Sequence, residues 1–249
     1  MQIPTTTPYS IRKGDREAAA YAVQRALNAS GQSLVEDAIF GEQTERAVIA
    51  WQRKSGLTPD GIFGPASSAK MATRLTAKVD TGLPTGLLRG FTELESANLI
   101  AAVNWSVSGG VDCGYTQRRV LDGSTEATVR RAFNSPYQLG LLAKQLRERR
   151  SVYYGKKGVT APTVLSFIAT REERAWRLAA LHHNWPYAAS RLAEGYALSD
   201  RRADWVPSGT RFADGSAVVT YMDWARFYAL GWAEKRHPGA VCKYVVRWS

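Results

Sequence analysis

Two related segments follow each other near the start of the chain and narrow the range of folds open to it. Val23-Gln24-Arg25 recurs as Trp51-Gln52-Arg53, and the run from Asp37 to Thr44 (DAIFGEQT) recurs from Asp60 to Ser67 (DGIFGPAS). The first pair is offset by 28 positions and the second by 23, so the first copy carries a loop five residues longer, around residues 28–36. Each copy predicts a helix, a turn through Asp-x-Ile-Phe-Gly, and a Thr or Ser that caps the next helix.

Apolar residues at helical spacing support this prediction. One stripe combines Ala22, Val23, Ala26 and Leu27, and the other combines Ala47, Val48, Ala50 and Trp51. We expect the two copies to pack together into a compact bundle of about three helices rather than an open solenoid, which is small but able to fold alone.

The repeat resembles the widespread peptidoglycan-binding domain of the three-helix type, over about Ile11 to Met71. The resemblance implies that this module anchors the chain to cell-wall polymer in a shallow groove between the repeats. The residues it suggests for the groove are Asp37, Phe40, Thr44, Trp51, Gln52, Asp60 and Phe63. An alternative holds for most of them, because aromatic residues are more often core and Asp residues most often cap turns.

Further along, the helical spacing places one carboxylate among apolar residues. With Leu87 at zero on a helical wheel, Phe91 falls at about 40° and Glu95 at about 80°. Glu93 falls at about 240°, where it forms an i,i+4 pair with Arg89 and is predicted to be solvated. Burial would raise the pKa of Glu95 and let it act as a general acid. The alternative is a buried glutamate that only bonds the backbone.

Four motifs in this part of the chain occur in the order found in soluble lytic transglycosylases and goose-type lysozymes, which the chain resembles. Glu95-Ser96 resembles the family's catalytic signature, and the run from Gly110 to Gln117 resembles its glycine-rich loop. The run from Phe133 to Tyr137 opens a helix as in the family, and the run from Ala180 to Trp185 resembles its "AAYNAG" segment. His183 stands where the family has tyrosine, and Tyr115-Thr116 stand where its loop has Leu-Met.

The resemblance implies a catalytic Glu95 and a set of residues that bind substrate or position the acid. This set is Ser96, Asn104, Asp112, Gly114, Tyr115, Gln117, His183 and Asn184. The implied reaction cleaves the β-1,4 bond between N-acetylmuramic acid and N-acetylglucosamine and leaves anhydromuramyl ends.

Three alternatives stay open. The first is a hydrolytic muramidase in which Glu95 works with Asp112, since most glycosidases use two carboxylates. The second is a non-catalytic wall-binding protein. The third is an amidase or endopeptidase, which would use zinc ligands or a Cys/His pair.

The predicted fold class is mainly α, a three-helix bundle followed by a lysozyme-like helical catalytic domain. The predicted divisions are a tail at 1–10, the binding domain at 11–73, a linker at 74–83 and the catalytic domain at 84–249, with 201–249 as an unassigned extension packed on it. In the second domain helices are expected near 84–96, 125–133, 136–150, 162–183 and 186–196. Strands are expected only in loops or near 241–248.

Composition limits the partners. The apolar and charged fractions, 45% and 22%, are those of a soluble globular protein. The formal charge of +11 favours polyanions. Peptidoglycan and anionic envelope polymers fit this charge, and we find no nucleic-acid-binding motif.

No apolar run approaches the roughly 20 residues that span a membrane, and the first residues do not resemble a signal peptide. We expect a monomer without metal or cofactor, made in a host cytoplasm as a bacteriophage endolysin and released to the wall through holes made by another protein. Cys113 and Cys242 are expected to be non-catalytic, with a buried thiol at Cys113 and a bridge between the two as the alternative.

Overall fold

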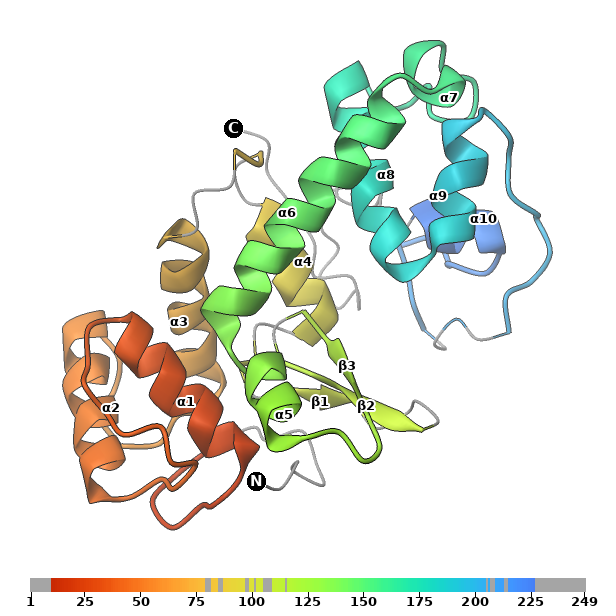
Figure 1. Cartoon of the computed structure of the whole chain (residues 1–249). Coiled ribbons are helices and arrows are strands. Elements are labelled where there is room, and N and C mark those ends of the chain that lie inside the picture. Colours follow the sequence, from red (N-terminus) through yellow and green to blue (C-terminus); the bar gives the residue numbers. More distant parts are fainter. Residues whose placement is uncertain are drawn as a thin grey trace. The chain divides into compact units, whose positions relative to one another are not determined.

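The protein is mainly helical, as predicted (Figure 1). The computed structural model describes residues 10–78, 82–84, 87–96, 99–100, 102–104, 109–114, 116–204, 206, 209–212 and 215–226. Contacts divide the chain into two compact units. The first unit comprises Met1–Gly82 and Phe91–Leu142, and the second comprises Leu83–Gly90 and Ala143–Ser249.

The first unit begins with the two repeats. They form α1 (Ala18–Ala29), α2 (Glu42–Ser55) and α3 (Pro65–Lys78), which confirms the predicted three helices. The segment before α1 forms a short antiparallel bridge with the Ile-Phe turn of each repeat: Arg16 pairs with Ile39 in the first copy, and Ile11 pairs with Phe63 in the second. Gly56 ends α2 in the left-handed conformation, with φ of +70°, as C-terminal glycines commonly do.

The rest of the first unit contains most of α4 (Leu87–Ser96), a small sheet and α5 (Glu126–Ala132). The sheet is antiparallel, with the order β1 (Val103–Asn104), β2 (Gly110–Cys113) and β3 (Arg118–Leu121). It lies where the sequence predicted a glycine-rich loop, so the expected loop is largely a hairpin.

One continuous hydrophobic core joins the repeats to the sheet and α5. It runs from Val23, Phe40 and Trp51 to Val111 and Phe133, all of which are buried. Arg130 of α5 also contacts the first repeat, because its guanidinium lies 4.8 Å from the ring of Tyr21 and donates to the carbonyl of Glu36. The predicted domain boundaries at residues 73 and 83 were drawn from sequence motifs, and they do not coincide with this shared core. As boundaries between functional domains they stay a prediction.

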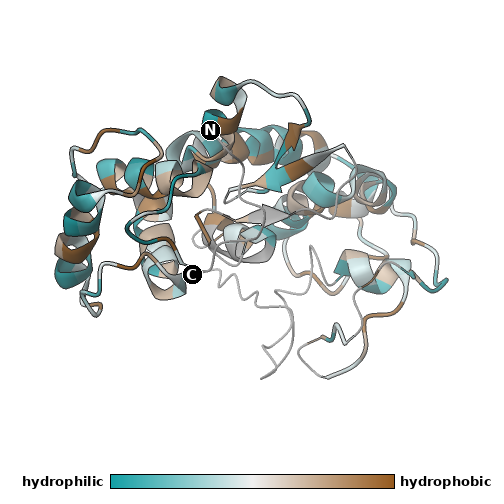
Figure 2. Ribbon diagram, turned by 90° about the horizontal axis from the view of Figure 1, so that it is seen from below, coloured by the Kyte–Doolittle hydropathy of each residue, from teal (hydrophilic) through white to brown (hydrophobic). Residues whose placement is uncertain are grey.

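The second unit contains most of α6 (Ser135–Tyr154), together with α7 (Lys157–Thr160), α8 (Arg171–Asn184), α9 (Pro186–Ala193) and α10 (Tyr221–Ala225). Its helices carry hydrophobic and hydrophilic residues side by side (Figure 2). Leu146, Leu178 and Leu192 are among the buried hydrophobic residues, whereas Val152 of α6 and Tyr187 of α9 are exposed. Gly158 of α7 packs against α9 so closely that an added Cβ would lie 2.1 Å from the carbonyl oxygen of Leu192.

The helix predicted over 162–183 is too long at its start, because α8 begins at Arg171. The Thr170 side chain caps it by accepting from the backbone N–H of Glu173 at 3.0 Å. The preceding carbonyls of Ile168 and Ala169 accept from the buried guanidinium of Arg174 instead of continuing a helix. The predicted helix over 186–196 ends earlier, at Ala193, and the strands expected near 241–248 lie outside the described residues.

Candidate functional site

The two repeats build the same hydrogen-bond network around a buried glutamine. Gln24 donates to the Asp37 carboxylate at 2.8 Å, to the Ile39 carbonyl at 3.0 Å and to the Thr44 hydroxyl at 3.2 Å. Its side-chain oxygen accepts from the backbone N–H of Ala38 at 3.0 Å. Each Asp-x-Ile-Phe-Gly turn is thus held by a helix that precedes it.

Gln52 repeats every one of these contacts in the second copy. It donates to Asp60 at 2.8 Å, to the Ile62 carbonyl at 2.9 Å and to the Ser67 hydroxyl at 3.3 Å, and it accepts from the backbone N–H of Gly61. Ala38 has a φ of +64° and Gly61 has a φ of +76° at the equivalent place. The sequence repeat is therefore also a repeat of hydrogen bonds.

The two aspartates are stabilised as carboxylates. Burial by itself raises the pKa of Asp37, but hydrogen bonds from Gln24 and the Ile39 backbone outweigh it and lower the pKa. Hydrogen bonds from the Ile62 backbone and from Gln52 lower the pKa of Asp60. Both side chains serve to hold their turns.

The remaining residues suggested for the groove lie in the interior. Phe40, Trp51 and Phe63 expose 0%, 1% and 2% of their surface, and the rings of Trp51 and Phe63 lie 5.8 Å apart. Thr44 and Gln52 are also buried. A role of these residues in wall binding stays a prediction, and any such role would act through the shape of the module.

Glu95 lies on α4 next to buried residues. Phe91 and Thr92 are buried, whereas Glu95 itself is half-buried. Ser96 is buried, and its hydroxyl donates to the Thr92 carbonyl one turn earlier at 2.8 Å. The side chains of Arg89 and Glu93, which were predicted to pair, lie outside the described residues.

The loop predicted to approach the substrate is a turn between β2 and β3, held by a buried glutamine. Gln138 of α6 donates to the Cys113 carbonyl at 3.4 Å and accepts from the backbone N–H of Thr116 at 3.4 Å. The Gln117 side chain donates to the Gly114 carbonyl at 2.9 Å. The sequence prediction did not include Gln138. The sequence signal that could have pointed to Gln138 is its position in the first turn of a helix. Asn134 caps this helix, because its side chain accepts from the backbone N–H of Tyr137.

Gly114 has no room for a side chain. Its φ is +74°, and an added Cβ would lie 2.5 Å from the Ala132 carbonyl oxygen and 2.7 Å from the Gln138 side chain. Tyr115 and the side chain of Asn104 lie outside the described residues, although Asn104 pairs with Asp112 through β1 and β2.

Asp112 lies opposite Arg119 in the sheet, and their charged groups are 3.8 Å apart. Burial raises the pKa of Asp112, and the charge of Arg119 opposes this increase. This cross-strand contact agrees with a role in holding the hairpin. Whether Asp112 also works with Glu95 stays a prediction.

Cys113 is a buried free thiol. It is completely buried, and burial followed by the nearby charge of Asp112 raises its pKa to about 12. A thiol with this pKa stays protonated at neutral pH and is a poor nucleophile. The predicted burial of the Cys113 thiol is therefore confirmed, and its non-catalytic role stays a prediction. Cys242 lies outside the described residues.

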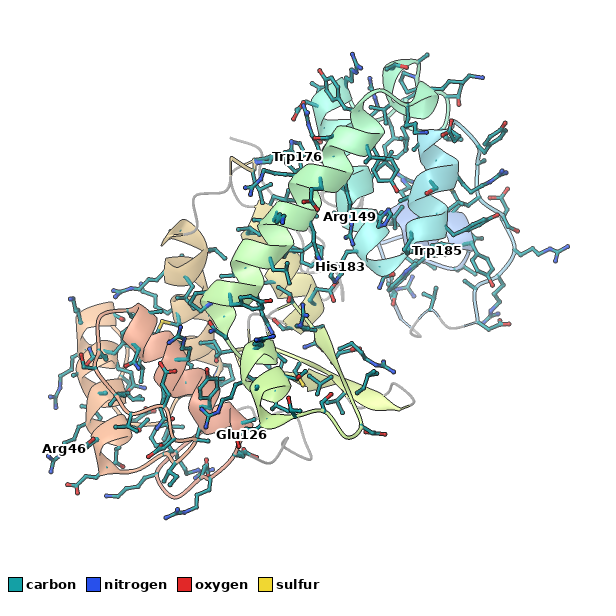
Figure 3. All side chains as sticks on the ribbon, in the orientation of Figure 1. Arg46, Glu126, Arg149, Trp176, His183 and Trp185 are labelled. Atoms are coloured by element: carbon teal, nitrogen blue, oxygen red, sulfur yellow. The ribbon has the colours of Figure 1, made fainter. Side chains whose placement is uncertain are left out.

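His183 and Asn184 belong to the second unit, at the end of α8. Figure 3 labels His183. Asn184 is exposed and accepts from the indole N–H of Trp224 at 3.4 Å, whereas His183 is half-buried. The neighbouring His182 forms a hydrogen bond of 2.5 Å between its Nδ1 and the Tyr153 hydroxyl. The predicted roles of His183 and Asn184 in positioning Glu95 remain predictions.

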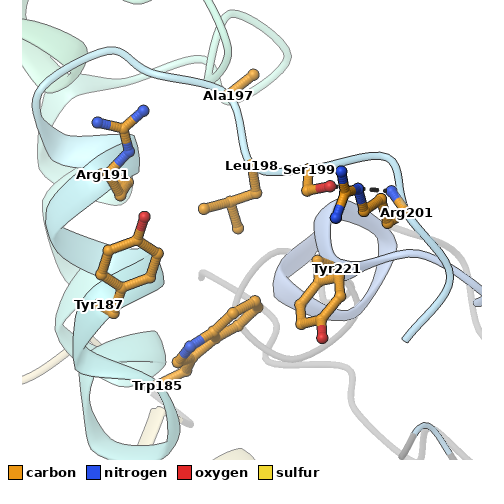
Figure 4. Close-up of a pocket in the computed structure, with 8 residues that line it drawn as sticks. All are labelled: Trp185, Tyr187, Arg191, Ala197, Leu198, Ser199, Arg201 and Tyr221. Carbon is orange, nitrogen blue, oxygen red and sulfur yellow. Dashed lines mark hydrogen bonds between the residues drawn. The ribbon is translucent and has the colours of Figure 1, made fainter. Parts of the chain in front are cut away.

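The second unit also contains a pocket of about 460 Å³. Its lining comes from the residue between α8 and α9, from α9, from the segment that follows it and from α10. The lining residues are Trp185, Tyr187, Arg191, Ala197, Leu198, Ser199, Arg201 and Tyr221 (Figure 4). The sequence prediction did not include this pocket. In the described part of the chain, no group of three or more His, Cys, Asp or Glu residues has the arrangement of a metal site, and no described helix is long and apolar enough to cross a membrane.

Comparison with known proteins identifies the N-terminal module. Residues 16–71 match the family described as "Putative peptidoglycan binding domain". The first unit therefore carries a domain of the peptidoglycan-binding type, which confirms the module predicted from the repeat.

Two curated proteins of Bacillus licheniformis are similar to parts of the chain. N-acetylmuramoyl-L-alanine amidase CwlL is 35% identical over 74 residues, which cover 28% of this chain and 21% of that protein. A "Probable N-acetylmuramoyl-L-alanine amidase" is 26% identical over 158 residues, which cover 56% of this chain and 43% of that protein. The chain spans less than half the length of either relative.

Proposed function

We propose that this chain is a peptidoglycan-degrading enzyme that binds the wall through residues 16–71 and cleaves its glycan strands with Glu95 as the acid. The observation that carries the wall substrate is the peptidoglycan-binding domain, with its repeated glutamine network. The observation that favours Glu95 is its half-buried position beside buried Phe91 and Thr92. In the sequence it precedes the hairpin that Gln138 holds.

In the proposed reaction, a protonated Glu95 donates its proton to the glycosidic oxygen between N-acetylmuramic acid and N-acetylglucosamine. The acetamido group of the substrate stabilises the positive charge that develops at the sugar. The Glu95 carboxylate then takes the proton of the muramyl C6 hydroxyl, whose oxygen closes an anhydro ring. Ser96, Gly114 and Gln117 would line the glycan path. If Asp112 held a water molecule instead, the product would be a reducing muramic acid end.

A second candidate function is cleavage of the amide bond between N-acetylmuramic acid and the peptide. It is favoured by the names of the two relatives, both amidases, of which one is similar over 56% of this chain. An amidase would leave the glycan strands intact and would not need Glu95.

Mass spectrometry of the soluble products from purified wall sacculi separates these functions. Anhydromuramyl ends support the proposed lytic transglycosylase, and reducing muramic acid ends support the hydrolytic muramidase. Free stem peptides with intact glycan strands would contradict glycan cleavage and support the amidase. Sacculi that are bound but release nothing would mean a non-catalytic wall-binding protein.

A further inference from the structure

The pocket of the second unit combines an aromatic wall with two arginines. The rings of Trp185 and Tyr221 lie 5.6 Å apart at an interplanar angle of 44°. Leu198 points toward the middle of the pocket between the aromatic rings (Figure 4). Tyr187 completes this side and exposes 65% of its surface. Flat, apolar ring faces of this kind are surfaces against which the C–H faces of a sugar can pack.

The charges around the pocket are positive. Arg191 and Arg201 line it, and the lining contains no carboxylate. Of the nearby acids, Glu194 pairs with Lys156 at 2.7 Å, and Asp223 accepts from the backbone of Thr220 at 2.9 Å. Asp200 lies between Ser199 and Arg201 in the sequence and is exposed, but it does not line the pocket. The pocket therefore offers positive charge without an acid of its own to neutralise it.

Arg191 has an unused hydrogen-bond donor. Its guanidinium stacks on the ring of Tyr196 at 4.3 Å, which holds the side chain in place. Its Nε is buried and has no hydrogen-bond partner among the described residues. A buried donor without a partner is costly. The guanidinium carries further N–H groups, which are suited to binding an anion in the pocket that Arg191 lines. Arginine suits a carboxylate in particular, because its planar group presents donors in a fork that matches the two oxygens.

We propose that this pocket binds a saccharide that carries a carboxylate, namely the N-acetylmuramic acid unit of peptidoglycan. The rings of Trp185 and Tyr221 would contact the sugar, and Arg191 and Arg201 would bind the lactyl carboxylate. The pocket volume of about 460 Å³ is in the range of small-ligand sites. This inference rests on peptidoglycan as the polymer on which the chain acts, but not on Glu95 as the acid.

Calorimetric titration of the full chain with two matched disaccharides tests the proposal. N-acetylglucosaminyl-N-acetylmuramic acid carries the lactyl carboxylate, and di-N-acetylchitobiose differs from it by lacking that group. We expect the first to bind about tenfold more tightly, the value of one charge-assisted hydrogen-bond pair. Arg201→Gln should abolish this preference, and Arg201→Lys should restore part of it.

Arg202→Gln is the matched control, since Arg202 is the next residue, is highly exposed and pairs with Asp204 outside the pocket. It should leave the preference unchanged. Equal binding of the two disaccharides, or an equal loss of preference in both Gln variants, would overturn the proposal. A glycerol phosphate oligomer is the third ligand. If it alone bound with dependence on Arg201, the pocket would be a site for a phosphate polymer and the muramyl assignment would be wrong.

The proposed catalysis is measured separately, by digestion of sacculi. If a Glu95→Gln chain digested sacculi normally while Arg201 controlled disaccharide affinity, the catalytic proposal would fail and the pocket proposal would stand. If Glu95→Gln lost digestion and the wild-type chain showed no disaccharide preference, the pocket proposal would fail and the catalytic proposal would stand.

Discussion

In the repeats and in the hairpin after Glu95, a buried glutamine forms hydrogen bonds that hold a turn, but the two regions differ in how far the glutamine lies from its turn in the sequence. In each repeat a buried glutamine holds a turn that follows it within 20 residues, through Gln24 or Gln52. In the hairpin a buried glutamine, Gln138, holds a turn that precedes it by more than 20 residues and belongs to another element. The networks of Gln24 and Gln52 join residues that are close in sequence, so the sequence shows them as a motif. The network of Gln138 joins the hairpin to a later helix, so no sequence motif shows it.

The largest expected effect lies at Glu95. Glu95→Gln keeps the size of the side chain but removes the proton that it would donate, so the rate of sacculus digestion should fall about 100-fold or more. Binding to sacculi through the repeats should not change. The control is Glu148→Gln, an exposed position of α6 that should digest normally. Normal digestion by the Glu95 variant would contradict the proposed chemistry.

Loss of Gln52 in the repeats and loss of Gln138 at the hairpin should have different effects on wall binding and digestion. Gln52→Ala should lower the free energy of unfolding of the first unit by about 2–4 kcal/mol, because Gly61 and Ile62 backbone groups lose their partner. It should also weaken binding to sacculi. Gln138→Ala should cost a similar amount by loosening the hairpin, and should slow digestion more than it weakens binding. Denaturant unfolding, pelleting with sacculi and digestion rates measure the three effects. If both variants lost binding and digestion in the same proportion, the proposal that the repeats bind the wall and the hairpin supports digestion would be contradicted.

Gly114 and Gly109 provide a matched pair at the two ends of the hairpin. Both have φ near +70°, but an added Cβ meets the Ala132 carbonyl only at Gly114 and meets nothing within 4 Å at Gly109. Gly114→Ala should lower the free energy of unfolding by about 2–3 kcal/mol, and Gly109→Ala by about 1 kcal/mol. Equal losses in denaturant titrations would mean that the hairpin does not pack on α5 and α6 as described.

The smallest expected effect is a difference in acid sensitivity. Burial, and then the charge of Arg149, lowers the pKa of His182 from 6.5, so the unfolded chain binds more protons and stability around His182 should fall as the pH drops below about 6.5. Asp37 has a pKa lowered from 3.8, so the repeats should lose stability only as the pH falls below that value.

Hydrogen exchange measured at pH 7, 5 and 3.5 follows the two regions separately. Amides of α8 should lose protection between pH 7 and 5, and those of α1 should lose it only near pH 3.5. His182→Gln should remove the first change and leave the second, while Asp37→Asn should do the reverse. Simultaneous loss of protection in wild-type α1 and α8 would contradict this assignment.

Prediction from the sequence succeeded where the interacting groups are close along the chain. The three helices of the repeats, the start of α6 within the run from Phe133 to Tyr137 and the buried Cys113 were all expected. The helix that became α8 was also predicted, but its predicted start at 162 was too early, because α8 begins at Arg171. The errors have a common physical cause. The start of α8 depends on Arg174 taking the carbonyls of Ile168 and Ala169, and hydrophobic periodicity carries no information about that competition. The buried positions of Phe40 and Phe63 were foreseen only as an alternative to a sugar-binding groove.

The amino-acid order is sufficient to establish the N-terminal module, because each turn aspartate and its glutamine lie within one repeat and need only the preceding helix to meet. It also singles out Glu95 as the one candidate acid among apolar neighbours. Folding of the whole chain decided the rest. Gln138 reaches the hairpin from a separate helix, and Trp185 and Tyr221 form one pocket although 35 residues separate them in the sequence. Such contacts form when distant apolar surfaces are buried together, and no short motif specifies them.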